Sequence, residues 1–573
     1  MMSTQWISNS DKKKMEELSK NTPFQIPEPI LEFLSSRDIT TKEELDEIMN
    51  IGPHQERPVT DLTGLDEAAE FLRVVKKENK HLVILGDYDC DGVCATTFGL
   101  EALREIGMKV DYYINSRFIE GFGMKKESVD NLLSEFPTCT AIMTVDNGIV
   151  AFEGVDYANE KGIDVLITDH HLGDEENPNA FGVVNPNQHG SETPFSEICG
   201  AAVIYKVLLK YFYDEGYDMK ILYRLSYLVG VATIGDVMPL RDENRFFVKR
   251  ALAHINSKNI PAMNTLMKIK GKEALNEEDL GFMLVPMLNA CGRLDGRPTI
   301  AMDFLLAETE DQLAQKCVEL IEKNEERKAL TEKQTEMAVE QVESQREVPD
   351  VIVVAHKDFH EGIVGIIAGR LKEKYYRPTI VLSEESFGFK GSARSIDPFH
   401  IKHALDNAQS YSDSMIGYGG HHLAAGLTVK KDQLDSFIES MQRVASETMS
   451  KEDLIPKFAV DAILPESYLT PDFVHQLSLL RPFGQGFQQP KFLIENIELK
   501  ESKLMGKENN HARYVTQGGK ALIDFFGSQK WEELLGFQDS IECISAIGYP
   551  SINVFRGEVK VQVMIEDHQI RLS

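Results

Sequence analysis

Short apolar runs alternate with amphipathic segments between residues 81 and 168. The apolar runs have the length of buried strands; they are HLVIL (81–85), KVDYYI (109–114), TAIMTV (140–145) and DVLIT (164–168). The segments near 92–106, 125–135 and 151–161 have the spacing of helices. Strands that alternate with helices of this length predict an α/β fold, in which a parallel sheet carries helices on both faces. Ligands of such sheets bind beyond the carboxyl ends of the strands.

The pattern divides the chain into five regions. They are a charged helical N-terminal segment (1–75), an α/β domain whose second half is mostly helical (76–310), a connecting helix (311–349), a second α/β domain (350–450) and a strand-rich domain (451–573). Residues 311–346 contain neither Gly nor Pro, and as one helix they would be about 54 Å long. The last region alternates most clearly in VFRGEVKVQVMI (554–565), which favours a small β-barrel.

The charge balance limits the kinds of partner. The 573 residues include 61 Lys and Arg against 91 Asp and Glu, a formal net charge of -30. This balance excludes a uniformly basic nucleic-acid coat and argues against docking on an anionic membrane. It leaves room for a nucleic-acid enzyme, because a groove can be locally positive or bridged by metal ions.

Cysteine content and hydropathy indicate where the protein works. The seven cysteines include no CxxC pair, so neither a disulfide framework nor a zinc finger is expected. That use of cysteine is typical of a reducing compartment, and we expect a cytoplasmic protein. The N-terminal MMSTQWISNSDKKK lacks the apolar segment of a secretory signal, and no run of about eighteen apolar residues predicts a membrane span.

Three carboxylates follow the first predicted strand, in the sequence LGDYDCDG. Asp87, Asp89 and Asp91 stand at alternate positions of a short loop, where they repel one another unless a cation lies between them. Hard divalent ions such as Mg²⁺ and Mn²⁺ take oxygen ligands of this kind. For this motif alone an acidic surface loop is an equally good explanation. An EF-hand fits poorly, because the loop lacks the Glu at position 12 and a preceding helix.

Acidic and histidine residues also follow the later strands. Asp146 ends the third strand, Asp169, His170 and His171 follow the fourth, and Asp236 lies in IGDVMPL. Each has an ordinary explanation, such as a helix cap, but that explanation must hold at every one of these places. By the strand-end rule these groups converge at one edge of the sheet. Mixed Asp and His ligation of two divalent ions about 3.5–4 Å apart is typical of phosphoryl hydrolases.

The second α/β region contains a candidate phosphate-binding face. Residues 351–430 carry nine Lys and Arg against eight Asp and Glu, and six of the fifteen histidines. FKGSARSI places Lys390, Ser392 and Arg394 on one side of a strand, and GYGGHHLAAGL combines Gly419 and Gly420 with His421. Backbone amides, an arginine fork and imidazole together bind phosphate well. The alternative is a glycine-rich turn with surface histidines.

The motifs together resemble those of one enzyme family. DYDCDG, VDNG, TDHH and GDVMPL, in this order and spacing, resemble the four motifs of the DHH phosphoesterase superfamily. Further stretches resemble its bacterial single-strand-specific exonucleases; they are SRFIEGFGM (116–124), VVNPNQ (183–188), ICGAAV (198–203), LNACGRL (288–294) and RPFGQGFQQPKF (481–492). GGHxxAAG resembles the signature of the DHH-associated domain, and the C-terminal strands resemble an oligonucleotide-binding barrel. The resemblance runs from about residue 30 to the end.

The resemblance implies a role for each site residue. One metal ion would be held by Asp87, Asp89 and Asp146, and the second by Asp91, Asp146, His170 and Asp236, with Asp146 bridging both. His171 would contact the scissile phosphate or help to position the leaving group, and Asp169 would orient its neighbours. The implied substrate-binding residues are Arg117, Asn289, Arg293, Lys390, Ser392, Arg394, Gly419, Gly420 and His421.

The resemblance also implies a function. We expect an exonuclease that depends on two divalent cations, Mn²⁺ in preference to Mg²⁺, and degrades single-stranded DNA from a free 5′ end in recombination and repair. Its expected partners are a single-strand-binding protein and a helicase, and no membrane. Alternatives are a phosphodiesterase for short oligoribonucleotides or cyclic dinucleotides, a pyrophosphatase, or an inactive replication scaffold. The first two would not need residues 450–573 as a barrel, and a scaffold would have lost metal ligands.

Overall fold

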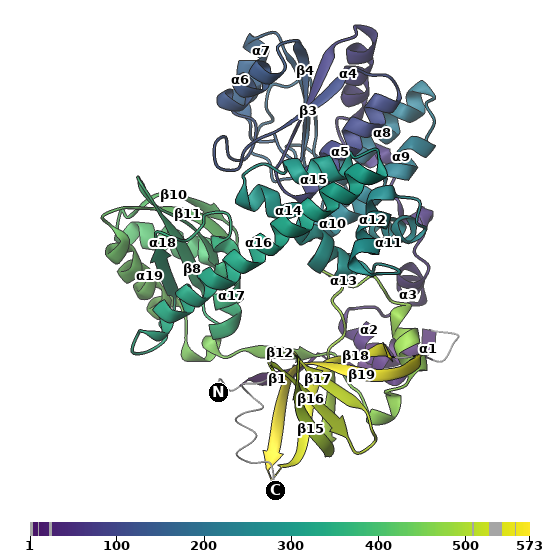
Figure 1. Ribbon diagram of the computed structural model, residues 1–573, viewed down its shortest axis with the longest axis vertical. Coiled ribbons are helices and arrows are strands. Elements are labelled where there is room, and N and C mark those ends of the chain that lie inside the picture. The colour runs from purple at the N-terminus through teal and green to yellow at the C-terminus, as the bar shows by residue number, and fades with distance from the viewer. Residues whose placement is uncertain are drawn as a thin grey trace. The chain divides into compact units, whose positions relative to one another are not determined.

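The computed structural model describes residues 4–9, 11–21, 26–506, 509–525, 541–555 and 557–572 (Figure 1). The chain divides into two compact units. Unit 1 contains the residues up to Glu56, Pro239–Arg241 and the chain from Lys457 onward. Unit 2 contains Arg57–Met238 and Asp242–Pro456.

The first sheet of unit 2 is the parallel sheet that the sequence predicts. Its order is β3-β2-β4-β5-β6, with the strands β2 (His81–Gly86), β3 (Val110–Ile114), β4 (Cys139–Val145), β5 (Asp164–Thr168) and β6 (Gly182–Val184). The sequence pattern identified the first four strands and missed β6, which has only three residues. All six residues of β2 are buried, as expected for a strand covered on both faces.

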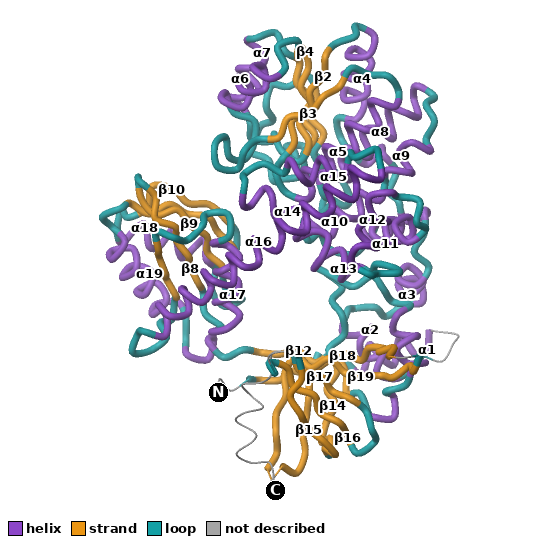
Figure 2. The backbone as a smooth tube through the Cα atoms, viewed as in Figure 1, coloured by secondary structure: helices purple, strands orange, loops and turns teal. Residues whose placement is uncertain are grey.

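Helices cover both faces of this sheet (Figure 2). They are α4 (Leu65–Lys77), α5 (Cys90–Glu105), α6 (Lys126–Glu135), α7 (Phe152–Glu160) and α8 (Gly200–Glu215). Apolar residues of α6 and α7 share a core with Val83, Ile142 and Val165 on one face. The alternate residues of the same strands, such as Ile84 and Met143, face α5 on the other side. The period-two alternation of a strand therefore distributes the helices between the two faces.

A helical region follows the sheet and leads into one long helix. Its elements are α9 (Lys220–Leu225), α10 (Tyr227–Gly235), α11 (Glu243–Asn256), α12 (Pro261–Lys270), α13 (Glu277–Asp279), α14 (Val285–Leu294), α15 (Thr299–Leu305) and α16 (Glu310–Glu343). The 34-residue α16 lies where the sequence predicts a helix, and a capping box of Thr309 and Gln312 begins it. It packs on α12, α14 and α15, and nearer its end on α17 and β7.

The second α/β region has a mixed sheet of order β10-β11-β9-β8-β7. The strands are β7 (Ile352–His356), β8 (Thr379–Glu385), β9 (Gly388–Arg394), β10 (Met415–Gly420) and β11 (Ala424–Lys430), and the helices are α17 (Val364–Tyr375), α18 (Ile401–Tyr411) and α19 (Leu434–Thr448). Ile380 and Leu382 of β8 face α18 and α19, whereas Val381 faces α17 and α16. The two groups of helices therefore lie on opposite faces of this sheet.

Unit 1 joins the two ends of the chain in one fold. Its elements are β1 (Gln5–Ser8), α1 (Lys12–Asn21), α2 (Glu28–Ser36), α3 (Lys42–Met49), β12 (Lys457–Val460), β13 (Ala462–Ile463), α20 (Pro471–Ser478), β14 (Phe492–Ile497), β15 (Leu499–Met505), β16 (His511–Thr516), β17 (Ala521–Asp524), β18 (Ile541–Phe555) and β19 (Glu558–Leu572). Seven strands form a sheet of order β13-β14-β18-β19-β17-β16-β15. The alternating stretch 554–565 contains the end of β18 and the start of β19, which pair in antiparallel register.

The N-terminal residues pack with the C-terminal strands. Strand β1 pairs in parallel with β12, and the buried ring of Phe33 in α2 packs against the rings of Phe483 and Phe487. Arg37 donates two hydrogen bonds, of 2.6 and 3.0 Å, to the buried carboxylate of Asp461. The segment 1–75 predicted as one N-terminal region is thus divided in the structure, because the apolar residues of α2 need a partner that only the C-terminal sheet supplies.

Among the described residues, no helix combines the length and the hydropathy that crossing a membrane requires.

We expect Phe33→Ala to destabilise unit 1 by about 3–5 kcal/mol, because the change leaves a cavity between α2 and the 483–487 turn. The measurement is urea unfolding followed by circular dichroism, with the unfolding midpoint compared between variants. Ile463→Ala is the matched control, since that side chain of the same unit is 52% exposed and should change stability by less than about 0.5 kcal/mol. Equal shifts for the two variants would contradict the packing described for α2.

Candidate metal centre

The carboxyl ends of three neighbouring strands bring the first acidic residues together. Gly86, Val145 and Thr168 are aligned in the parallel register of β2, β4 and β5. Asp87, Asp146 and Asp169 are the residues that follow them, so all three leave the sheet at the same edge. This convergence was predicted from the strand ends, and it is what positions the centre.

All six predicted metal ligands lie in this centre. Ligand atoms within 4.8 Å of one another form three sets: Asp87, Asp89 and Asp146; Asp91, His170 and Asp236; and Asp146, His170 and His171. The imidazole Nε2 of His170 lies 3.1 Å from Asp146 Oδ1, 3.4 Å from Asp236 Oδ2 and 3.7 Å from Asp91 Oδ2. Asp146 and His170 each belong to two of the three sets, so the sets adjoin one another.

The DYDCDG loop is folded by its own side chains. Asp89 precedes α5 and accepts hydrogen bonds from the N–H groups of Asp91 and Gly92, at 3.0 and 3.2 Å. Gly92 has to be a glycine, because a Cβ there would lie 2.4 Å from the carbonyl oxygen of Asp87. The side-chain oxygen of Asn289 accepts from the N–H of Cys90 at 2.7 Å, so Asn289, which the sequence places among the substrate-binding residues, supports the metal loop.

The N-terminus of α8 fixes Asp91. Its two carboxylate oxygens accept hydrogen bonds from the N–H groups of Gly200 and Ala201, at 2.6 and 2.8 Å. Gly200 approaches so closely that a Cβ would lie 2.7 Å from the Cβ of Asp146. The helix dipole favours the negative charge of Asp91 at this point. These contacts give the ICGAAV stretch (198–203) a role, which is to hold Asp91 through the backbone of Gly200 and Ala201. The chemistry of its side chains alone had indicated none.

The electrostatics of the centre fit bound cations. Burial and mutual repulsion raise the pKa of Asp91 to about 7 and that of Asp236 to about 8, and they hold the pKa values of Asp87 and Asp146 well above the ordinary range. Asp146 Oδ1, His170 Nε2 and Asp236 Oδ2 are buried and have no hydrogen-bond partner in the part of the chain that the structure describes. Buried acceptors that face one another are costly unless a cation binds between them, so these residues fit a pair of hard divalent ions.

The two histidines differ in environment. Burial and the neighbouring His171 lower the pKa of His170 to about 4, which leaves its Nε2 as a lone-pair donor. Burial opposes charge on His171, but the hydrogen bond and the charge of Asp169 outweigh burial and raise the pKa of His171 to about 9. Asp169 accepts from His171 Nδ1 at 2.8 Å and from the N–H of His170 at 2.7 Å. Asp169 therefore holds the ring of His171 and the backbone of His170 by hydrogen bonds.

Two asparagines of the VVNPNQ stretch also hold this pair. The side-chain amide of Asn185 donates to the carbonyl of His171 at 2.9 Å, and that of Asn187 donates to the carbonyl of His170 at 2.6 Å. Neither residue was predicted to take part in the site. The only signal in the sequence was the resemblance of the stretch that contains them.

Arginines surround the approach to the acids. The Arg117 guanidinium lies 5.4 Å from the ring centre of Tyr88, and Arg293 donates to the carbonyl of Gly362 at 3.4 Å. Burial, with the charges of Arg117 and Arg327, lowers the pKa of Arg293 to about 10. Burial and Arg117 also lower the pKa of Arg394. These effects show that the predicted residues Arg117, Arg293 and Arg394 lie near one another.

The predicted residues of the second sheet share one open face. Cross-strand register aligns Ser392 with Gly426 and Gly419, and no described atom beyond its chain neighbours lies within 4 Å of where a Cβ would stand on Gly419. Arg394 donates to Ser392 Oγ at 2.8 Å. Lys390 projects from the same side of β9 and pairs with Glu361 at 2.8 Å. The face is therefore open above its glycines and basic along one strand.

The GGHH turn lies beside this face. Gly420 has a φ of 152° and would bring a Cβ to 2.3 Å from the carbonyl oxygen of Ala424, so only glycine fits. His421 is exposed, and its N–H donates to that carbonyl at 2.8 Å. His421 belongs to none of the metal-ligand sets among the described residues.

Family models match three successive parts of the chain. They are the DHH family N-terminal domain at residues 81–233, the DHHA1 domain at 348–447 and the RecJ OB domain at 460–567. The single-stranded-DNA-specific exonuclease RecJ of Dickeya dadantii is 32% identical over 524 residues, which cover 88% of this chain and 90% of that protein. The RecJ of Bacillus subtilis is 33% identical over 514 residues, which cover 88% of this chain but only 63% of that longer relative.

Solved structures share the fold of this chain. RecJ from Thermus thermophilus in complex with Mn²⁺ matches 99% of this chain and 80% of its own, with a TM-score of 0.81 at 24% identity. An exonuclease RecJ bound to manganese matches 70% of this chain and all of its own, with a TM-score of 0.59 at 28% identity.

The fold and the centre define a phosphoesterase of the DHH class, built from an α/β catalytic region, a DHHA1 region and a C-terminal OB domain. Within that class, the chain belongs to the RecJ family of exonucleases. The fold class and the family resemblance predicted from the sequence are thereby confirmed. The manganese of the solved neighbour agrees with the divalent cations expected for this centre.

We expect the metal-free protein to become less stable as the pH rises from about 5 to 8. Asp91 and Asp236 have raised pKa values of about 7 and 8, so folding takes up protons that the unfolded chain has lost above about pH 4. That stabilisation is complete below the unfolded pKa and is lost as the pH passes the folded values. Mn²⁺ holds the carboxylates in charged form, so saturating Mn²⁺ should remove or reverse the trend.

The measurement is the melting temperature across this pH range in EDTA and in Mn²⁺. Asp236→Asn should weaken the pH dependence of the melting temperature in EDTA, since it removes one carboxyl group whose pKa is raised. The same pH dependence in both media would show that these acids do not form a cation site.

Proposed function

We propose that the protein hydrolyses phosphodiester bonds of single-stranded DNA from the 5′ end, with Mn²⁺ or Mg²⁺ as cofactor, in recombination and repair. The observation that carries this proposal is the grouping of adjoining acidic and histidine ligand sets at one sheet edge, in which Asp146 lies with Asp87 and Asp89 and also 3.1 Å from His170, with a cluster of arginines nearby. The relatives named as single-stranded-DNA-specific exonucleases support the substrate, and the 5′ polarity rests on the resemblance to that family.

In this proposal Asp87, Asp89 and Asp146 hold one ion. Asp91, Asp146, His170 and Asp236 hold the other, since all three carboxylates lie within 3.7 Å of His170 Nε2. A pair of divalent cations makes water a better nucleophile near pH 7 and offsets negative charge on the phosphate. The protein keeps its ligands fixed before substrate arrives, through the α8 amides on Asp91 and the hydrogen bonds that Asp169 accepts.

His171 contacts the substrate in this scheme. Its Nδ1 is engaged by Asp169, so Nε2 is the ring nitrogen left to meet the scissile phosphate or the leaving oxygen. The edge-to-face contact of its ring with Phe122, at 5.1 Å between centroids, limits the rotation of the imidazole. Asp169 acts only through His171 and His170.

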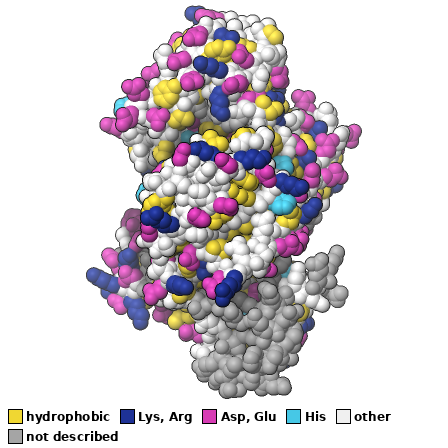
Figure 3. Space-filling model, turned by 90° about the vertical axis from the view of Figure 1, so that its left-hand side faces the viewer, with side chains coloured by type: hydrophobic (Ala, Val, Ile, Leu, Met, Phe, Trp, Pro, Cys, Tyr) yellow, Lys and Arg dark blue, Asp and Glu magenta, His cyan; other side chains and the backbone are white. Residues whose placement is uncertain are grey.

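The substrate phosphates would lie along the open face of the second sheet. Ser392 Oγ and Arg394 Nη2 come within 3.2 and 3.1 Å of the Cβ position of Gly365, in the first turn of α17. A helix N-terminus, a hydroxyl and a guanidinium together form an anion site. The glycines of β10 and β11 allow a sugar-phosphate backbone to approach closely. Acidic and basic side chains are interspersed on the face drawn in Figure 3. Because the chain as a whole carries a net charge of -30, attraction for phosphate in this proposal comes from the local grouping of Ser392, Arg394 and the first turn of α17.

The other candidate functions fit less well. A phosphodiesterase for dinucleotides does not need residues 460–567, which match an OB domain suited to gripping a longer strand. An inactive scaffold would not retain six ligands so close together. A single-strand-binding protein and a helicase as partners, and a cytoplasmic location, belong to the proposal because the recombination role requires them.

The test is degradation of single- and double-stranded DNA and RNA oligonucleotides, labelled at either end, with Mn²⁺ and with Mg²⁺. We expect nucleotides to be released from the 5′ end of single-stranded DNA. Release from the 3′ end, or a preference for RNA or dinucleotides, would contradict the proposal.

Asp146→Ala should abolish hydrolysis, because it removes the carboxylate shared by both proposed metal sites. Loss of one repelling charge should leave the metal-free protein at least as stable as wild type by thermal melting. Glu127→Ala, an exposed change on α6, is the control for activity. A variant that kept more than about a tenth of the wild-type turnover would contradict the two-metal assignment.

Arg394→Ala should raise KM for a single-stranded substrate about ten- to a hundredfold, the effect of losing one charge-assisted hydrogen bond of about 1.5–3 kcal/mol. Calorimetric titration should show unchanged Mn²⁺ affinity, because Arg394 lies outside the ligand sets of the described residues. Arg443→Ala, an exposed change on α19, serves as control. A large fall in Mn²⁺ affinity for Arg394→Ala would place this residue in the metal centre instead.

A further inference from the structure

The loop after β3, residues 115–124, touches three parts of the site. Arg117 lies over Tyr88 of the metal loop, Phe122 packs on His171, and the ring of Phe118 lies 5.7 Å from that of His360 in the second α/β region. Every residue of the loop is described by the structure, and none belongs to a helix or a strand. Side-chain and turn contacts must therefore fix the conformation of this loop.

Glu120 is the residue on which those contacts converge. Its Oε1 accepts hydrogen bonds from Tyr113 Oη at 2.6 Å, Asn131 Nδ2 at 2.9 Å and Arg297 Nη2 at 3.1 Å. Its Oε2 accepts from the N–H of Ser116 at 2.8 Å. The donors come from β3, from α6, from the segment before α15 and from the loop itself, so one carboxylate joins four segments.

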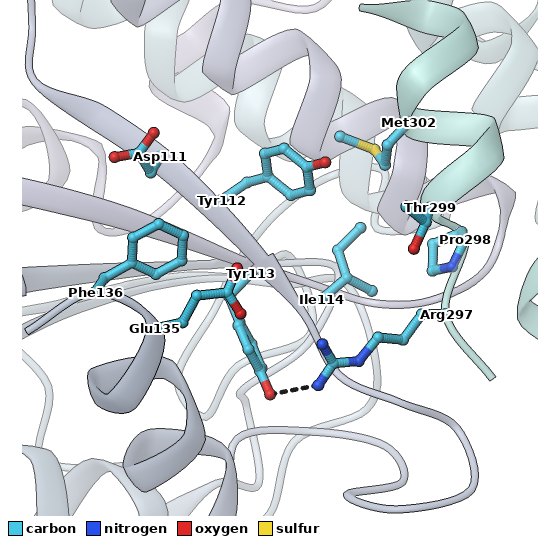
Figure 4. Close-up of a pocket in the computed structure, with 10 residues that line it drawn as sticks. All are labelled: Asp111, Tyr112, Tyr113, Ile114, Glu135, Phe136, Arg297, Pro298, Thr299 and Met302. Atoms are coloured by element: carbon cyan, nitrogen blue, oxygen red, sulfur yellow. Dashed lines mark hydrogen bonds between the residues drawn. The ribbon is translucent and has the colours of Figure 1, made fainter. Parts of the chain in front are cut away.

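The environment of Glu120 makes this arrangement hard to replace. Its side chain is only 1% exposed, so water cannot substitute for a lost partner. Burial alone would raise the pKa of Glu120, but the hydrogen bonds from Tyr113, Asn131 and Ser116 outweigh it and leave the pKa below its usual value. Arg297 is 39% exposed and lines a cavity of about 220 Å³, where Figure 4 shows it meeting Tyr113. Within this network the Glu120 carboxylate is shielded from water, whereas the Arg297 side chain is partly exposed.

The same network reaches the backbone of Arg117. The Arg117 N–H donates to the carbonyl of Gly296 at 2.8 Å, and Gly296 precedes Arg297, the cationic partner of Glu120. On the other side, the N–H groups of Glu120 and Gly121 donate to the carbonyl of Ser116 at 3.1 and 2.9 Å. Glu120 therefore holds the segments on both sides of Arg117.

We propose that Glu120 is a positioning residue that sets the conformation of the 115–124 loop and so holds Arg117 toward the substrate phosphate. This inference rests on the proposed function, in which Arg117 binds substrate. Glu120 itself touches no reacting atom. It acts by keeping the arginine preorganised, so that less conformational freedom is lost when substrate binds.

Glu120→Gln tests this inference, because it keeps the shape and places an amide N–H₂ among donors. We expect KM for a single-stranded DNA oligonucleotide to rise about tenfold, with kcat within twofold and calorimetric Mn²⁺ affinity unchanged. Combined with Arg117→Ala, it should cause no further loss, since residues that act as one unit are not additive. Tyr113→Phe, which removes one donor, should change KM in the same direction by less, and Glu127→Gln is the matched control.

The rate of amide hydrogen exchange is a second measurement, and it does not depend on activity. In Glu120→Gln the peptide containing the Arg117, Glu120 and Gly121 amides should exchange faster, whereas Glu127→Gln should leave it unchanged. Unaltered exchange, losses that multiply with Arg117→Ala, or a fall in Mn²⁺ affinity would each overturn the inference. A wild-type protein that did not cleave single-stranded DNA would overturn the proposed function instead, and exchange would still decide whether Glu120 sets the loop.

Discussion

Repulsion among buried carboxylates is the constraint on which the rest of the centre depends. Asp87, Asp91, Asp146 and Asp236 lie close together, and burial first and their mutual repulsion second raise their pKa values. Such an arrangement exists only if the surrounding fold keeps it in place. The parallel strand ends supply the positions, and the first amides of α8 supply two hydrogen bonds to Asp91. The fold thus holds the carboxylates in a repulsive arrangement, and bound cations would relieve that repulsion.

The sequence predicted the parts of the structure that follow from local pattern. Buried runs identified β2, β4 and β5, and the acids after them were expected at one edge because parallel strands end together. Contacts between residues far apart in the chain were not predictable in this way. Asn185, Asn187 and Gly200 carry no signal of their own, since an asparagine or a glycine acquires a role only when folding brings it to a particular backbone group.

The high acidity of the chain becomes easier to reconcile with a nucleic-acid enzyme once the arginines are placed. The charge of Arg117 contributes to the lowered pKa values of Arg293 and Arg394, so the three guanidinium groups lie near one another. Acidic and basic groups therefore occupy separate places in the site. The acids lie at the strand ends, and the guanidinium groups lie on the approach to them. The net charge of -30 is a sum over the whole chain. A bound phosphate group responds mainly to the charges within a Debye length of about 8–10 Å.

The pairing of both chain ends in unit 1 has a consequence for biosynthesis. The residues up to Glu56 are made first, yet the strands that complete their core begin at Lys457, about 400 residues later. At about 5–20 residues per second, a ribosome needs roughly 20–80 s to cover that interval. During this time Ile30, Phe33 and Leu34 lack the C-terminal part of their core, and of its members only those of the N-terminal segment, such as Leu18 and Leu45, are present. The nascent chain must therefore carry a partly uncovered apolar helix while unit 2 is made, and the core of unit 1 can close only after the strands from Lys457 onward emerge.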